Sequence, residues 1–588
     1  MTVMHEPLRL SLTQPLLKAL QQLQVETSEQ EIYKALVEPP NPEMGHLAFG
    51  CFIVAKALKK APAAVAVDLK LALGEVLGVS SIEAAGPYLN FKFAPEKLAH
   101  EVLLPILDQS LFSKSLVLDA PKTMIEYSQP NTHKELHVGH MRNLCLGDAV
   151  IRLLRRCYGH DKIISTTFPG DVGTHVAKCL WYIKNYVGLD VLAQKRNDPL
   201  RGEWLGQMYS SANIKLEDEE KTPAYEKNKA ELTLILKQLE AHQGEFYDLW
   251  KETREWSIEL MKKVYHWANV DFDRWYWESD VDADSVKTIK KYFAEGKLQE
   301  SQGAIGLDFS HENLGFCLLL KSDGTGLYAT KDVELARRKF EDFKIEKSIY
   351  VVDMRQALHF KQVFKTLEVL GFKQAQNCYH LQYNFVELPD GAMSSRKGNI
   401  VPLMLLVEKM KAHVKAEYLV RYQNEWSVAE VDLVADQVAK GAIKYGMVRQ
   451  DTNKKIVFDM NEWLKLDGES GPFIQYSSAR INSLVKKFGP VSNELTLSLL
   501  NHPSELKLMQ HLMNFNSVVL TSAEAYRPST LCTYLYETAK KFNVFYHDCS
   551  IGQADGELKQ ARLALSAATG LVLKNGLALL GIPVPDRM

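Results

Sequence analysis

The sequence predicts an α/β protein with a parallel sheet at its centre, a small α/β module before the sheet and an all-helical bundle after it. Three observations support this. Residues 123–168 follow a strand, helix, strand pattern, residues 1–110 combine short helices with a strand pair, and from about 425 onward the pattern is helical to the last residue. Because 588 residues are too many for one hydrophobic core, we expect about three domains.

The first module is predicted from helix spacing followed by turn residues. Apolar spacing indicates helices at 16–23 and 30–37, and then a helix pair that breaks at Pro62. SIEAAGPYLNFKF (81–93) predicts two strands that turn at its Gly-Pro dipeptide, because these two residues together favour a turn.

The central unit is predicted from a change of hydrophobic period. TMIEYS (123–128) and KIISTTF (162–168) are short apolar strands. Between them, apolar residues at spacings of three and four form one face of a helix that stops at Gly159: Leu146, Ala149, Val150, Leu153, Leu154 and Cys157. Strand, helix and strand over about 45 residues imply a right-handed parallel crossover, as in a Rossmann-type sheet.

A charged, Trp- and Tyr-rich helical stretch from about 182 to 280 is predicted to be an insertion between the two halves of the sheet. We expect the sheet to resume after it with three strands, one helix and a last strand: AIGLDF (304–309), FCLLL (316–320), SIYVVD (348–353), 359–370 and 379–386.

Composition excludes several protein classes. A formal net charge of -2 provides no bulk positive field for nucleic acid, although a basic patch on one face is still compatible with it. The eight cysteines form no C-x-x-C pair, so we expect buried thiols in a reducing compartment and no structural zinc. The N-terminus lacks the apolar core of a signal peptide, and no run of about 18 apolar residues occurs. We therefore expect a cytoplasmic protein that does not contact membranes.

The loop SQPNTHKELHVGHMRN (128–143) carries the strongest functional signal. It lies between the first strand and the long helix, where parallel sheets bind ligands and where a helix N-terminus presents free N–H groups. Gly139 would let a flat ring or sugar approach the backbone, and His137 and His140 would direct two donors at phosphates. Lys134 and Arg142 would add positive charge. The pattern favours a nucleoside triphosphate site, with a surface turn and half of a metal site as alternatives.

These residues resemble class I aminoacyl-tRNA synthetases, and within them the arginyl-tRNA synthetases. HVGH resembles the first signature of that class, and EYSQPNTHKELHVGHMRN its arginine-specific form. Ordered matches continue along the chain: PEMGHLAF, AGPYLNFKF, PGDVGTH (169–175), GTGLYATKD (324–332), IYVVDMRQALHFKQVF (349–364), GAMSSRKGN (391–399), GPFIQYSSARI (471–481), YLYETAKKFNVFYHDC (534–549) and LKNGLALLGIPVPDRM (573–588).

The resemblance implies three domains and a two-step reaction. The domains would be a tRNA-elbow module at 1–112, a catalytic domain at 113–425 and a helical anticodon-binding domain at 426–588. Arginine would attack the α-phosphate of ATP, with Mg²⁺ on the triphosphate, and the 2′-hydroxyl of tRNA(Arg) would then take the arginyl group. The family also implies that activation needs bound tRNA and that the protein is a monomer.

Catalytic and ATP-binding residues follow from the same resemblance. His137, Gly139, His140 and Lys134 would bind or align the nucleotide. A second signature loop would add Met393 as an ATP contact and further donors from Ser394, Ser395, Arg396 and Lys397. That loop has Ala392 where the signature normally carries Lys, and we expect Lys134 to supply the missing charge. Other departures are Gln129, Thr132, His133, Val172 and His175.

Arginine recognition needs carboxylates, because a planar guanidinium is best held by paired acceptors. By position, Glu126 and Asp332 resemble the acidic pocket residues, Asn131 the contact to the amino acid's backbone end, and Tyr328 and Gln356 other pocket members. As alternatives, Tyr328 could be core and Asp332 could pair with Lys331 or Arg337. A buried Glu126 without a partner would be costly, which favours function.

tRNA contacts are expected in both outer domains. Tyr88 and Asn90 resemble the elbow-contacting positions, with a pair in the hairpin core as the alternative. Tyr536 and Met588 resemble anticodon contacts. Two further readings stay open: another class I synthetase or smaller adenylyltransferase, and a tRNA-binding paralogue that has lost catalysis.

Overall fold

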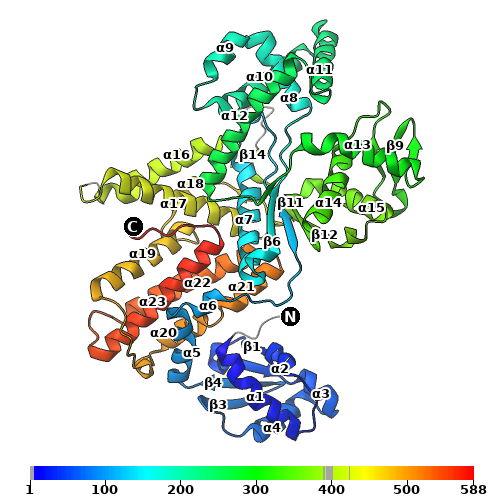
Figure 1. Ribbon diagram of the computed structural model, residues 1–588. Coiled ribbons are helices and arrows are strands. Elements are labelled where there is room, and N and C mark those ends of the chain that lie inside the picture. Colours follow the sequence, from blue (N-terminus) through cyan, green and yellow to red (C-terminus); the bar gives the residue numbers. More distant parts are fainter. Residues whose placement is uncertain (1–5, 389–390, 393–400, 423) are drawn as a thin grey trace. The chain divides into compact units, whose positions relative to one another are not determined.

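The computed structural model describes residues 6–388, 391–392, 401–422 and 424–588 (Figure 1). The chain divides into two compact units. Unit 1 consists of Met1–Asp119, Arg156–Tyr158 and Leu464–Met588, and unit 2 of Ala120–Arg155 and Gly159–Trp463.

Unit 2 is built on a five-stranded parallel sheet of order β12-β11-β5-β6-β7. Its strands are β5 (Thr123–Glu126), β6 (Ile163–Thr167), β7 (Arg274–Trp275), β11 (Lys347–Asp353) and β12 (Cys378–Tyr383). The chain runs from β5 through helix α7 (Val138–Tyr158) to β6, while β11 pairs with the other side of β5. The predicted Rossmann-type sheet is therefore confirmed, and its switch point lies at the carboxyl end of β5.

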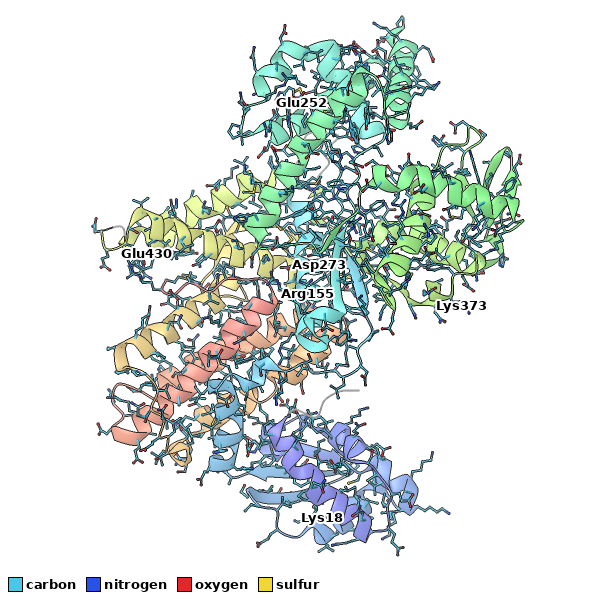
Figure 2. All side chains as sticks on the ribbon, in the orientation of Figure 1. Lys18, Arg155, Glu252, Asp273, Lys373 and Glu430 are labelled. Carbon is cyan, nitrogen blue, oxygen red and sulfur yellow. The ribbon has the colours of Figure 1, made fainter. Side chains whose placement is uncertain are left out.

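Local sequence explains why α7 stops and how it is fixed to the sheet. Gly159 adopts φ +95° directly after the helix, a conformation that side chains rarely tolerate. Near that end, Arg155 pairs with Asp273 at 2.6 Å (Figure 2), and the same carboxylate accepts the Ser165 N–H of β6. One acid thus connects the helix to strand β6.

The predicted helical insertion is present and has its own core. It consists of α8 (Thr174–Tyr182), a π-helical turn (Ile183–Val187), α9 (Leu189–Lys195), α10 (Arg201–Glu219), α11 (Ala224–Glu240) and α12 (Glu245–Ala268). Trp181 and Trp250 are buried between these helices together with Leu180, Ile235 and Phe246. The aromatic residues that made the segment stand out in the sequence are therefore its packing residues.

Two predicted strands do not belong to the parallel sheet. AIGLDF and FCLLL form β9 (Ala304–Asp308) and β10 (Phe316–Leu320), which pair antiparallel with each other, and β9 also pairs with β8 (Gln299–Ser301). The prediction that the sheet resumes with them is wrong. The short connection 309–315 cannot make a parallel crossover, which needs a dozen or more residues.

The helices α13 (Glu278–Ala294), α14 (Tyr328–Phe343) and α15 (Ala357–Val369) pack against β10 of this second sheet. Unit 2 continues with α16 (Leu403–Val414) and α17 (Val428–Val448), and it ends within α18 (Met460–Leu464). The prediction that the chain is purely helical beyond 425 is wrong, because β15 (Ile456–Val457) pairs parallel with β13 (Val386–Leu388). Strand β13 also pairs with β14 (Gly391–Ala392). Helix α17 lies in unit 2.

Unit 1 contains the N-terminal module. Its antiparallel sheet has the order β1-β2-β4-β3, with β1 (Leu36–Val37), β2 (Leu47–Gly50), β3 (Val79–Ala85) and β4 (Tyr88–Phe93). The helices are α1 (Pro7–Gln22), α2 (Glu29–Ala35), α3 (Phe52–Leu58), α4 (Pro62–Leu73), α5 (Pro95–Leu107) and α6 (Ser110–Ser113). The predicted break at Pro62 and the predicted strand pair are confirmed.

Unit 1 also contains a bundle of helices from the C-terminal part of the chain. These are α19 (Gly471–Phe488), α20 (Pro503–Leu512), α21 (Phe515–Glu524), α22 (Pro528–Asp548) and α23 (Gly556–Leu579). The helices α19, α22 and α23 pack against one another, and small residues permit this: a side chain at Gly576 would overlap Leu535. Within the described residues, no helix is both long and apolar enough to cross a bilayer.

Candidate active site

The two histidines of the HVGH motif cap the helix that follows them. His137 is the N-cap of α7, and its Nδ1 accepts the Gly139 N–H at 3.1 Å. Nδ1 of His140 accepts the His137 N–H at 3.2 Å, and the ring centroids lie 4.0 Å apart. Because both Nδ1 atoms accept, the proton of each neutral ring is on Nε2. Each histidine therefore keeps one N–H donor for a ligand.

Burial keeps both rings neutral. It lowers the pKa of His137 to about 4, with a smaller contribution from the positive charge of Lys134. Burial also lowers the pKa of His140 well below its ordinary value, helped by His137 and Lys134. At neutral pH the pair thus offers dipolar donors and no net charge.

Gly139 has a role that the sequence did not reveal. A Cβ at this position would lie 2.8 Å from Cε1 and 3.0 Å from Nδ1 of His137. Both distances are below ordinary van der Waals contact, so the ring of His137 would have to move. Gly139 therefore makes room for the capping imidazole itself, in addition to any ligand.

The two cations expected at the loop behave differently. Lys134 is half-buried, with Nζ 5.0 Å from the ring centroid of Tyr209 on α10. Arg142 is 1% exposed, and its guanidinium donates to the main-chain carbonyls of Asp451, Thr452 and Lys454 at 2.9–3.3 Å. The expectation that Arg142 adds a ligand-facing charge is wrong, because its donors are used inside the fold.

Glu126 stands at the carboxyl end of β5 and is 3% exposed. Its Oε2 forms an ion pair with Nζ of Lys339 on α14, which is fully buried, and its Oε1 accepts the side-chain amide of Gln129 at 3.2 Å. The carboxylate thus has partners within the chain. Burial of Glu126 is then no argument for a function. Its position at the switch point of the sheet remains an argument for one.

Asp332 lies on α14, and its Oδ2 is 2.5 Å from Nε2 of His359 on α15. The expected alternative partners are used elsewhere: Lys331 pairs with Glu278 and Asp282, and Arg337 with Glu334. Both alternatives for Asp332 are therefore wrong.

The remaining residues expected at the arginine site have accessible side chains. Tyr328 begins α14 and is 71% exposed, so the alternative that it belongs to the core is wrong. Gln356 is exposed at the N-cap of α15. Asn131 is half-buried and forms a bridge with Gly170.

Glu278 was missed by sequence reasoning. It is 5% exposed at the start of α13, and its Oε1 lies 3.3 Å from Lys331 Nζ. A Cβ at Gly170 would overlap Oδ1 of Asn131 and lie 3.1 Å from Oε2 of Glu278, so the glycine lets both groups approach. Burial raises the pKa of Glu278 to about 7. The PGDVGTH segment marked Gly170, but nothing near Glu278 in the sequence marked its carboxylate.

Comparisons with known proteins agree along the whole chain. Three family models match in succession: "Arginyl tRNA synthetase N terminal domain" over residues 10–93, "tRNA synthetases class I (R), catalytic domain" over 106–460 and "DALR anticodon binding domain" over 474–588. The arginine–tRNA ligase of Bdellovibrio bacteriovorus is 61% identical over 590 residues, which cover 100% of both chains.

The chain belongs to the arginyl-tRNA synthetase family. A second relative, the arginine–tRNA ligase of Clostridium acetobutylicum, is 33% identical over 96% of this chain and 98% of its own. Among solved structures, the Thermus thermophilus arginyl-tRNA synthetase superposes with a TM-score of 0.80 at 27% identity, covering 99% of this chain and 100% of that one. The Plasmodium falciparum enzyme, at 19% identity and TM-score 0.75 with both chains fully covered, shares the fold.

In this synthetase two residues that depart from the usual sequence near the signature, His133 and His175, have hydrogen-bond partners within the fold. His133 is fully buried between the hydroxyls of Thr132 (3.0 Å) and Thr253 (2.8 Å), which leaves its pKa at about 3 through burial. His175 lies 3.2 Å from the Gly170 carbonyl. Met393, Ser394, Ser395, Arg396 and Lys397, predicted from the second signature, lie outside the described residues.

The residues expected to contact tRNA differ in exposure. Tyr88 is 36% exposed at the start of β4, whereas Asn90 is 3% exposed and its Oδ1 has no hydrogen-bond partner among the described residues. Tyr536 and Met588 are half-buried, and the ring of Tyr536 lies 5.2 Å from Nζ of Lys540.

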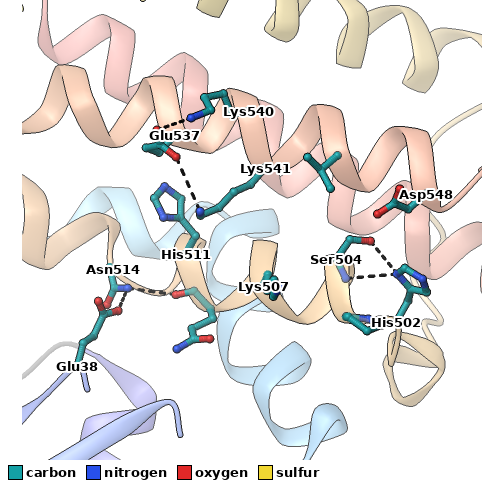
Figure 3. A pocket seen from close by; sticks show the side chains of 13 residues that line it. Glu38, His502, Ser504, Lys507, His511, Asn514, Glu537, Lys540, Lys541 and Asp548 are labelled. Carbon is teal, nitrogen blue, oxygen red and sulfur yellow. Dashed lines mark hydrogen bonds and ion pairs between the residues drawn. The ribbon is translucent and has the colours of Figure 1, made fainter. Parts of the chain in front are cut away.

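Unit 1 also contains a cavity of about 580 Å³ between α20 and α22 (Figure 3). Its lining combines Lys507, Lys540 and Lys541 with Glu38, Glu537 and Asp548, so that opposite charges nearly balance. None of the predicted site residues in the described part of the chain lines it. Also within the described residues, no group of three His, Cys, Asp or Glu side chains could hold a metal ion.

Proposed function

We propose that this synthetase joins L-arginine to tRNA(Arg) through an arginyl-adenylate, converting ATP to AMP and diphosphate. The observation that carries the proposal is the 61% identity to an arginine–tRNA ligase along the entire chain. The comparisons give the inactive paralogue no support. A monomeric state and a cytoplasmic location stay predictions.

For the first step, Nε2–H of His137 and of His140 would donate to the phosphates of ATP at the N-terminus of α7. Lys134 would add the charge that Ala392 lacks. The loop containing Met393, Ser394, Arg396 and Lys397 would contribute further donors. Mg²⁺ would arrive with the nucleotide, held by phosphate oxygens and water, as this ion prefers. Catalysis would then consist of alignment and charge stabilisation.

For arginine, Glu126 and Asp332 would accept the guanidinium N–H groups, with Tyr328 and Gln356 beside them and Asn131 at the backbone end of the amino acid. Support comes from α14, whose 3.6-residue period puts Tyr328 and Asp332 on one face. Two acceptors on different elements suit a planar cation with several donors better than an ammonium group.

For tRNA, Tyr88 and Asn90 would contact the elbow, and Tyr536 and Met588 the anticodon. The exposure of Tyr88 suits stacking on an unpaired base, whereas Asn90 is buried and its place in this contact rests on the family resemblance alone. The domain limits 1–112, 113–425 and 426–588 stay part of this proposal.

The test is amino-acid-dependent ATP–diphosphate exchange, measured with and without tRNA(Arg), using arginine, lysine and glutamine. We expect exchange with arginine alone, and only when tRNA is present. Exchange with another amino acid would refute the roles of Glu126 and Asp332. If tRNA binds but no amino acid supports exchange, the non-catalytic paralogue is the correct reading.

A further inference from the structure

We infer that Lys339 is a positioning residue for arginine recognition, which it serves by holding the carboxylate of Glu126 in place. This inference rests on the proposed arginine-binding role of Glu126. The two residues are 213 positions apart in the sequence, yet their side chains form a buried ion pair. Lys339 is fully buried and Glu126 is 3% exposed.

The ammonium of Lys339 is fixed from two sides. Its Nζ contacts Oε2 of Glu126 and lies 4.1 Å from the ring centroid of Tyr350. Tyr350 of β11 is the register partner of Glu126 of β5. In neighbouring parallel strands such partners point to the same side of the sheet, so the aromatic ring and the carboxylate face α14 together. A cation held between a ring face and a carboxylate has little freedom to move.

The pairing leaves acceptor sites on Glu126 unused. A carboxylate offers about four acceptor sites. Lys339 uses one on Oε2, and Gln129 uses one on Oε1. The unused sites on both oxygens are what a guanidinium fork would occupy. Lys339 and Gln129 therefore set the plane of the carboxylate without blocking it.

One helix also links the two acids of the proposed pocket. Asp332 and Lys339 are seven residues apart on α14, two turns along the same face. The helix thus presents one acid directly and holds the other through Lys339. If α14 shifted, both guanidinium acceptors would move together, which makes Lys339 part of the geometry that selects arginine.

The decisive measurement separates the KM for arginine from the KM for ATP in tRNA-dependent exchange. The variants are K339M, which keeps the chain length but removes the charge, K339R, which keeps the charge, E126Q and E126Q/K339M. Lys444 supplies a matched control, because it is likewise fully buried and pairs with buried Asp148 at 2.8 Å on other helices.

We expect K339M to raise the KM for arginine at least tenfold and to leave the KM for ATP within twofold. K339R should recover the KM for arginine to within threefold of the parent, and K444M should change neither KM more than twofold. If Lys339 is purely structural, K339M and K444M should both lower thermal stability and leave the KM for arginine unchanged. That result would overturn the inference.

The double variant separates this inference from the proposed function. If Lys339 acts through Glu126, E126Q/K339M should match E126Q in its KM for arginine. A further rise of more than threefold would refute the inference. This comparison also stands if K339M fails to fold, because the double variant leaves no buried charge unpaired. An unchanged KM for arginine in E126Q would refute the role of Glu126 itself. A raised value in E126Q with an unchanged value in K339M would refute only the role of Lys339.

Discussion

Replacing Gly139 with Ala should separate the activity of this enzyme from its stability. The added Cβ would lie 2.8 Å from Cε1 of His137, so the imidazole has to swing away and lose its 3.1 Å bond from the Gly139 N–H. A ring at the end of a side chain moves at little cost to folding. Losing the cap hydrogen bond costs about 0.5–2 kcal/mol, and the higher helix propensity of Ala over Gly, about 1 kcal/mol, offsets most of it, so we expect the melting temperature to stay nearly unchanged.

The effect on catalysis should be much larger. A preorganised donor to a developing negative charge contributes about 2.7–4 kcal/mol, and one ordinary hydrogen bond about 0.5–1.5 kcal/mol. A displaced but still present Nε2–H should cost between the upper end of the range for an ordinary hydrogen bond and the upper end of the range for a preorganised donor, about 1.5–4 kcal/mol. At 1.36 kcal/mol per factor of ten, kcat/KM in arginine- and tRNA-dependent exchange should fall about 10- to 1,000-fold.

Two further variants test the reasoning. In an H137A background, G139A should add less than a twofold loss, because the displaced ring is no longer there. G552A is the matched control, since its Cβ would meet only Cζ of Phe488 at 3.6 Å, and it should be neutral. A folded G139A enzyme with parental kcat/KM would refute the argument. An equal loss with and without His137 would instead show that Gly139 acts on the ligand directly.

Three other outcomes are expected. G147A should cost about 1–3 kcal/mol or more in urea unfolding, because its Cβ would overlap both the Cβ and the ring of buried Tyr127, and an unchanged urea midpoint would contradict this. Stability should fall as pH drops from about 6.5 to about 4. Burial lowers the pKa of His46 and His511 to about 4, so the unfolded chain binds more protons than the folded one in this window. The free energy of unfolding should therefore fall by up to about 1.4 kcal/mol per pH unit for each histidine. H46N should make urea midpoints between pH 7 and pH 5 less pH-dependent, and an unchanged slope would contradict this assignment. Y88A should raise the KM for tRNA about tenfold in aminoacylation, as expected for one lost base stack, while the KM values for ATP and arginine stay constant; equal changes in all three would speak against an elbow contact.

The fold was predictable where local pattern and connection length agree. β5, α7 and β6 lie close to their predicted limits, because a period change and a glycine stop define them. β9 and β10 were assigned to the wrong sheet because apolar runs of five residues give no pairing partner. The connection 309–315 was the overlooked signal, since it is too short for a parallel crossover.

The proposed site was predictable only in part, because its acids pair with residues remote in the sequence. The resemblance indicated Glu126 and Asp332, but no local pattern pointed to Lys339, His359 or Glu278 as their neighbours. Lys339 looks like an ordinary solvated lysine of an amphipathic helix until β5 and β11 are placed beside it. Such partners become visible only when three-dimensional packing shows which charges share a buried space.

The spacing of the HVGH motif has a physical explanation in helix capping. Its histidines occupy the N-cap and N3 positions of α7, the two places from which side chains can satisfy free N–H groups at a helix start. A lysine there could donate to phosphate but could not accept from the backbone, and an aspartate could cap but would repel the phosphate. Imidazole accepts with Nδ1 and donates with Nε2–H, so one ring both starts the helix and faces an anion. The same hydrogen bonds that fix the helix N-terminus therefore fix the tautomer that adenylate formation is proposed to need.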